Sequence, residues 1–216
     1  FEDNSYTYTR LNPLESKKQL DSLRVRKTDK IDAEKLAMSQ FILNRKPSYV
    51  QEALYQELRD LSRFYQNLTE DIVCAKNRLH KVLQITFPEL ENILSAPTGE
   101  QYWNLVITFP CNSFVLESDD ATLTAIIRQS TAKRISEKRV TYLVDKLTKL
   151  ANQSYCAVKK TSPVIEEVKY YAGELLRLSE HRQGVVEEMV TLAQSLPEYE
   201  ILLSIPGIAE TTATSI

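Results

Sequence analysis

The sequence predicts a mainly α-helical protein built on two long helices with heptad repeats. Only 4 of its 216 residues are glycine, which is too few for folds that depend on many tight turns or on phosphate-binding glycine loops. Apolar residues recur alternately every four and three positions along two stretches of about thirty residues, which is typical of a coiled coil or a bundle helix. The composition, 43% hydrophobic and 26% charged, is that of a globular chain of one large domain or two small ones.

The N-terminal part is predicted to contain a strand, a turn and a helix. Residues 5–10, SYTYTR, alternate β-forming side chains and lead into an Asn-Pro pair at 12–13, which predicts a strand followed by a turn. Residues 17–27 predict a loop or a short helix. Thr28 is a suitable N-cap for a helix that begins at the next residue and runs toward Asn44.

The first long helix is predicted to end at Pro88, and shorter helices follow it. Proline and glycine residues interrupt the chain as far as Pro110, which predicts short segments there. Helices are then expected over 121–129 and 133–152. The heptad seam of the long helix consists of Leu54, Leu58, Leu61, Tyr65, Leu68, Ile72, Ala75, Leu79 and Val82.

The second long helix repeats the heptad signal, and only Arg182 interrupts its apolar seam. One charged seam residue can fix register or partner choice at a cost in stability. Two such helices predict an antiparallel pair folded on itself, a dimer interface, or both. Residues 202–216 predict a turn at Pro206-Gly207 that leads into a helix. The seam consists of Val164, Val168, Tyr171, Leu175, Leu178, Arg182, Val185, Met189, Leu192 and Leu196.

Charge is segregated along the chain although the net charge is only −2. Residues 17–30 carry a net charge of +4, and residues 128–160 carry nine basic side chains against two acidic ones. Basic blocks of this size can attract phosphate backbones through a salt-screened field. A solvated helix face is the alternative interpretation. The pI of 5.9 argues against a protein that coats nucleic acid over its whole surface.

Cysteine usage and hydropathy indicate a cytoplasmic protein with no membrane partner. The chain has 3 cysteines, an odd number at wide spacing, which suits a reducing compartment better than a disulfide framework. We expect neither a signal peptide nor a membrane-spanning segment.

Two aspartates at the start of the first predicted helix are the best candidates for chemistry. Asp29 and Asp32 are three residues apart, which places both carboxylates on one helix face. Two hard oxygen ligands at that separation favour Mg²⁺ or Mn²⁺, and a pair of such ions can clamp a phosphodiester. Helix-start aspartates are also common caps, so a purely structural role is the alternative.

The stretch LRVRKTDKIDA at 23–33, followed by Leu36-Ala37, resembles the lysine-threonine-aspartate and aspartate-alanine signature of the DEDD-type transposases of bacterial insertion sequences. Asn12-Pro13 matches an asparagine-proline pair upstream of that signature in the family. LSIPGIAETTA at 203–213 resembles the opening of the family's second conserved domain. These transposases are RNA-guided recombinases with a RuvC-like, RNase H-type catalytic domain.

The resemblance implies three regions. Residues 1–46 would be the C-terminal part of the RuvC-like α/β domain, 47–200 a helical coiled-coil middle, and 201–216 the start of a helix-hairpin-like second domain. Asp29 and Asp32 match the last two acidic residues of the family's catalytic, metal-binding tetrad. The other two acidic residues would lie upstream and the nucleophilic serine downstream, so we expect this piece alone to be inactive.

For the intact protein the resemblance implies Mg²⁺- or Mn²⁺-dependent strand cleavage and exchange in DNA transposition, in the bacterial cytoplasm. The implied partners are DNA, a structured guide RNA and a second copy of the chain held through the coiled coil. A non-enzymatic coiled-coil scaffold or dimerisation module, and a degenerate transposase remnant, are the alternatives. The basic residues expected to bind nucleic acid are Arg24, Arg26, Lys27, Lys30, Lys133, Arg134, Lys138 and Arg139.

Overall fold

A computed structural model of the chain describes residues 6, 8–14, 28–43, 46 and 52–215. The chain divides into two compact units, Phe1–Gln56 and Glu57–Ile216. Regular structure in the described ranges is helical throughout, which confirms the mainly α prediction. None of the helices in these ranges is both long enough and apolar enough to cross a bilayer.

The first unit contains α2 (Asp29–Ile42), which begins at the residue that the sequence predicts. Thr28 has extended backbone geometry, and its side-chain oxygen accepts a hydrogen bond from the Ile31 amide at 3.4 Å. This bond satisfies one of the amides that a helix leaves without a partner in its first turn. The predicted N-cap is therefore confirmed, and it fixes which residues lie in the first turn of α2.

The strand predicted over 5–10 is wrong for the residues that the structure describes. Tyr8 to Asn12 are irregular, and no strand occurs elsewhere in the described ranges to pair with them. Alternating β-formers become a strand only where a neighbouring strand takes up their backbone groups. Thr9 instead donates its hydroxyl hydrogen to the Lys46 carbonyl, at 3.2 Å. The α/β character expected for residues 1–46 stays a prediction.

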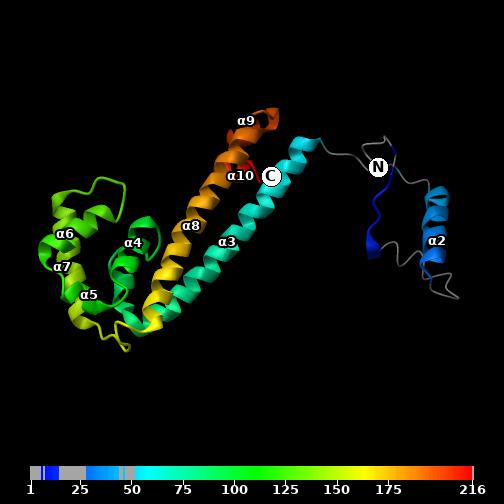
Figure 1. Cartoon of the computed structure of the whole chain (residues 1–216). Helices are drawn as coiled ribbons and strands as arrows, with labels where there is room; N and C mark the ends of the chain where they lie inside the picture. Colours follow the sequence, from blue (N-terminus) through cyan, green and yellow to red (C-terminus); the bar gives the residue numbers. More distant parts are fainter. Residues whose placement is uncertain (1–5, 7, 15–27, 44–45, 47–51, 216) are drawn as a thin grey trace. The chain divides into compact units, whose positions relative to one another are not determined.

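The second unit is built on two long antiparallel helices, α3 (Ala53–Thr86) and α8 (Pro163–Ala193), which lie side by side (Figure 1). Phe64 on α3 meets His181 on α8 edge to face, with ring centroids 5.3 Å apart. All the predicted seam residues on both helices are buried or half-buried. Arg182, the charged seam residue, places its guanidinium 5.9 Å from the centre of the Tyr65 ring, where a cation is attracted to the aromatic face.

A cluster of shorter helices lies at the end of this pair where α3 ends and α8 begins (Figure 1). α4 packs against α8, and α7 packs against α5, α6 and η2. Tyr102, Trp103 and Phe109 are buried in the core of this cluster. The elements are η2 (Pro88–Asn92), α4 (Glu100–Thr108), α5 (Asn112–Leu116), α6 (Asp120–Gln129) and α7 (Glu137–Gln153).

α7 begins four residues later than the predicted start at Lys133. Ser136 is its N-cap, and the serine hydroxyl accepts a hydrogen bond from the Arg139 amide at 3.4 Å. The apolar face of the helix begins only at Val140, so it does not mark the helix start, whereas the serine cap does. Lys133 and Arg134 therefore lie in the loop between α6 and α7, and only Lys138 and Arg139 lie on the helix.

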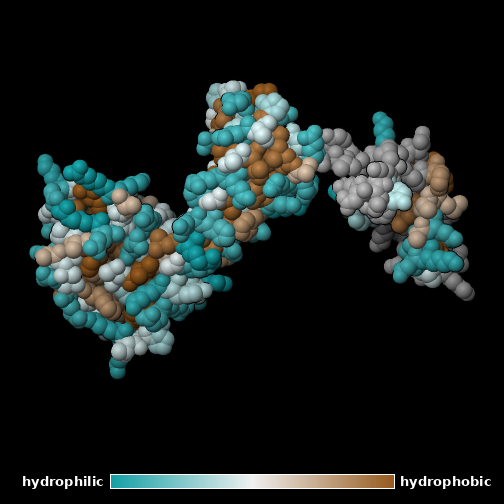
Figure 2. Space-filling view, turned by 45° about the horizontal axis from the view of Figure 1, so that its top comes forward, coloured by the Kyte–Doolittle hydropathy of each residue, from teal (hydrophilic) through white to brown (hydrophobic). Residues whose placement is uncertain are grey.

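The other end of the long helices carries α9 (Pro197–Leu203) and α10 (Glu210–Ala213). Gly207, in the predicted turn between them, has a φ of 93°, a left-handed backbone geometry that glycine adopts without strain. α10 packs against both α8 and α9. Ile201 and Ile205 are exposed, and hydrophobic surface is visible at this end of the unit (Figure 2).

A buried amide joins α5 to the C-terminal end of α7. The side-chain nitrogen of Asn112 donates to the Ala151 carbonyl at 3.1 Å and to the Ser154 carbonyl at 2.7 Å. Carbonyls at a helix C-terminus have no partner within the helix. Asn112 is 9% exposed, so water cannot readily replace these two bonds.

We expect Asn112→Ala to destabilise the chain by about 1–3 kcal/mol, since it removes the buried side-chain donor that two carbonyls share. The measurement is the free energy of unfolding in urea, followed by circular dichroism. Asn152→Ala is the matched control, because the Asn152 amide is exposed and donates only to Thr148 within its own helix, at 2.9 Å. Equal losses from the two variants would contradict the assigned role of Asn112.

Candidate functional site

Asp29 and Asp32 lie together in the first turn of α2. The Thr28 cap sets the start of the helix, so the two carboxylates occupy neighbouring positions on one helix face. Asp29 is exposed and Asp32 is half-buried. The positive end of the helix dipole favours negative charge at these positions.

One carboxylate oxygen of this pair lacks a hydrogen-bond donor. Asp32 Oδ1 is buried and takes part in no hydrogen bond with the described residues. A buried anionic oxygen without a donor is costly, and a cation would satisfy it. The pair therefore fits a hard divalent metal such as Mg²⁺, which prefers carboxylate oxygens.

Two carboxylates are only part of a metal site. The described residues contain no group of three or more His, Cys, Asp or Glu side chains placed to hold a metal ion. Of the basic residues expected beside the aspartates, Lys30 is exposed in the first turn of α2. Arg24, Arg26 and Lys27 lie outside the described residues.

The loop between α6 and α7 forms a basic, open hollow of about 400 Å³. We call Arg128, Lys133 and Arg134, which line it, the loop patch. Lys133 and Arg134 are both exposed, and neither forms an ion pair with a described residue. The hollow also adjoins the first turn of α7, where backbone amides and the helix dipole favour anions.

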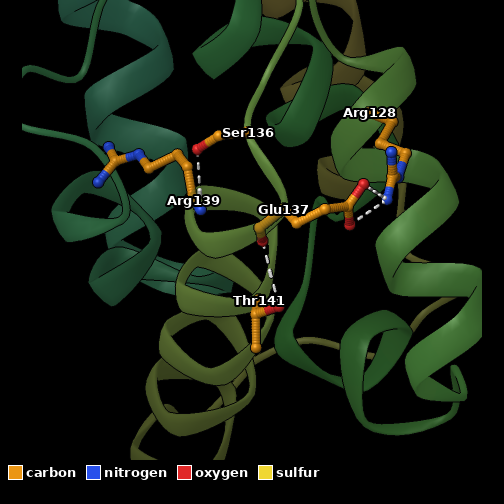
Figure 3. Close-up of polar contacts among 5 residues, drawn as sticks. All are labelled: Arg128, Ser136, Glu137, Arg139 and Thr141. Carbon is orange, nitrogen blue, oxygen red and sulfur yellow. Dashed lines mark hydrogen bonds and ion pairs between the residues drawn. The ribbon is translucent and has the colours of Figure 1, made fainter.

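The third cation of the loop patch is already paired. Arg128 donates to both carboxylate oxygens of Glu137, at 2.7 and 2.5 Å, and the two side chains point toward each other across the hollow (Figure 3). Hydrogen bonds from Arg128 and its charge hold the pKa of Glu137 below the usual value for a glutamate. Glu137 therefore stays ionised and cancels one positive charge of the patch at neutral pH.

Lys138 and Arg139 do not belong to the loop patch. Arg139 points away from the Arg128–Glu137 pair (Figure 3), and its guanidinium carbon lies 5.2 Å from the centre of the Tyr142 ring. Lys146 Nζ lies 5.8 Å from the same ring. The four basic residues predicted on one helix are therefore divided. Lys133 and Arg134 lie in the loop, and Lys138 and Arg139 lie on α7.

Tyr142 was not among the expected site residues, and Arg128 was expected only as one charge of the basic block 128–160. Cations three residues before and four residues after an aromatic share its helix face, and this spacing around Tyr142 is present in the sequence. The pairing of Arg128 with Glu137 depends on how α6 and α7 pack, which no local spacing indicates.

Comparison with known protein families finds a match for the N-terminal part of the chain. The sequence model of the DEDD transposase family of the IS110 type, described as transposase, matches residues 1–88. The matched segment contains α2 with Asp29 and Asp32, and it continues through α3. No curated protein and no solved structure matches the chain. Residues 1–88 are therefore a segment of a DEDD transposase of the IS110 type.

Proposed function

We propose that this chain is the middle part of a DNA transposase that cleaves and exchanges strands with the help of Mg²⁺ or Mn²⁺. The observation that carries the proposal is the Asp29–Asp32 pair at the start of a capped helix, inside the segment that matches a transposase family. A carboxylate pair on one helix face is what a phosphodiester-cleaving metal site requires of a helix.

Asp29 and Asp32 would hold the metal through their carboxylate oxygens. The metal, when bound, would stabilise negative charge on the phosphodiester and activate the attacking oxygen. The exposed Lys30 ammonium would bind a neighbouring phosphate. Because two carboxylates alone do not make a complete site, we propose that cleavage needs further acidic residues and a nucleophile from the rest of the transposase.

The second unit would bind nucleic acid through the loop patch. Lys133 and Arg134 present two positive charges to solvent beside the N-terminus of α7. Such an arrangement binds phosphates without reading sequence. A structured guide RNA and the DNA substrate are the proposed partners, in the bacterial cytoplasm. The acidic pI confines this binding to patches rather than to the whole surface.

The α3–α8 pair would act as the arm that positions these parts and as the contact to a second copy. The seam residues on these helices are apolar or aromatic except for Arg182, which lies against Tyr65. A scaffold with no catalytic role is the second candidate, and the continuous core along both long helices favours it. The two candidates differ in whether Asp29 and Asp32 matter to DNA chemistry.

We expect the double variant Asp29→Asn, Asp32→Asn to lower strand cleavage by the intact transposase about a thousand-fold or more, since metal catalysis supplies several kcal/mol. Binding of Mn²⁺, measured by titration calorimetry, would be lost together with cleavage. Binding of the guide RNA would be unchanged.

Glu34→Gln is the matched control, since Glu34 is an exposed carboxylate on the next turn of α2. It should cleave at the normal rate. Normal cleavage by the double aspartate variant would reject the metal site and favour the scaffold.

Removing the acid that pairs with Arg128 should strengthen nucleic-acid binding. In Glu137→Gln, Arg128 would become available to one more phosphate. The plot of log K against log salt concentration should then steepen by about 0.9 for duplex DNA. The measurement is fluorescence anisotropy of labelled duplex DNA and of an RNA hairpin at several salt concentrations.

Glu166→Gln is the matched control, because it also removes one negative charge and one ion pair. Glu166 lies at the start of α8 and pairs with Lys169 at 2.9 Å. We expect this control to leave the salt dependence unchanged. If both glutamate variants gave the same slope as the parent chain, the loop patch would not be a phosphate-binding surface.

A further inference from the structure

Tyr142 is half exposed on the outer face of α7, between two cations. Its side of the helix is opposite to the buried positions of α7, which face the core of the helix cluster. The Arg139 guanidinium carbon lies 5.2 Å from the centre of the ring, and Lys146 Nζ lies 5.8 Å from it. The ring is 50% exposed, which is unusual for a large aromatic side chain with no core contact to make.

One of the two cations at this ring is held by a hydrogen bond to another element. Lys146 Nζ also donates to the Ile93 carbonyl at 3.1 Å, which fixes its position beside Tyr142. Lys149, one turn further along, lines an open hollow of about 390 Å³ together with Tyr142 and Lys146. We call Arg139, Tyr142, Lys146 and Lys149 the α7 stripe. Asp145 is the acidic residue among those that line this hollow.

We propose that the α7 stripe binds an unpaired nucleotide, with the base stacked on Tyr142 and the flanking phosphates on Arg139, Lys146 and Lys149. An aromatic platform between cations is the combination with which proteins bind single strands, because every base has a π face and every nucleotide a phosphate. The inference rests on the proposed nucleic-acid binding of the second unit. It adds that this unit prefers unpaired over paired segments.

The loop patch and the α7 stripe would then have different tasks. Lys133 and Arg134 carry charge without an aromatic, so they would bind a phosphate backbone whether or not its bases are paired. Tyr142 offers a flat surface that only an exposed base can cover. A strand that leaves a paired stem would meet both surfaces in turn along α7.

The test compares Tyr142→Ala with Tyr142→Phe in the full chain. The probes are a single-stranded oligouridine, a single-stranded oligothymidine and a duplex DNA, and binding is measured by fluorescence anisotropy. Tyr142→Ala should weaken binding of the single strands by about five-fold to a hundred-fold and leave duplex binding unchanged. Tyr142→Phe should keep the parent affinity, because the ring remains. Tyr170→Ala removes an exposed tyrosine from α8 and should change nothing.

The outcomes separate this inference from the proposed function. If Tyr142→Ala bound all three probes as tightly as the parent chain does, the stacking site would be overturned and the loop patch would be unaffected. No binding of any probe by the parent chain would overturn both. A loss with oligouridine alone would assign the site to RNA, and a loss with oligothymidine alone to DNA. Photocrosslinking of thiouridine in the oligouridine to the peptide that contains Tyr142 would place the base directly.

Discussion

The burial of one apolar seam between α3 and α8 is the constraint on which the second unit depends. The two helices run antiparallel, and their seam residues are removed from water along most of their length. Burial of this kind is the main favourable contribution to folding, and long helices owe most of their stability to it rather than to helix propensity. The cluster of short helices is attached to this pair through α4, which packs on α8.

Polar contacts determine how the short helices join the long pair. His80 on α3 lies 2.6 Å from Glu91 in η2. The Ala157 amide, in the segment before α8, donates to the Ile85 carbonyl near the end of α3, at 3.0 Å. With the two bonds of Asn112, these contacts fix the segments that enter and leave the cluster. The α7 stripe lies on a helix held in this way, and the loop patch lies just before that helix.

Much of the fold could be predicted from the sequence, because helix signals are local. Thr28 marked the start of α2, Pro88 the end of α3, and the two heptad seams the buried faces of the long helices. The strand at residues 5–10 failed because strands need partners distant in sequence. The predicted helix start at Lys133 was wrong because the Ser136 cap begins α7 at Glu137. The positions of Asp29 and Asp32 in the first turn of α2 could be predicted from their spacing and the Thr28 cap, whereas the Arg128–Glu137 pair depends on how α6 and α7 pack.

The length of α3 determines the distance between the two ends of the second unit's long helices. Its 34 residues, at 1.5 Å per residue, make a rod about 50 Å long. A rod of that length spans about 15 base pairs of duplex, at 3.4 Å each. The cluster of short helices lies at one end of the α3–α8 pair, and α9 and α10 lie at the other (Figure 1). If both ends of such a rod met one double helix, they would contact separate turns of it rather than neighbouring phosphates.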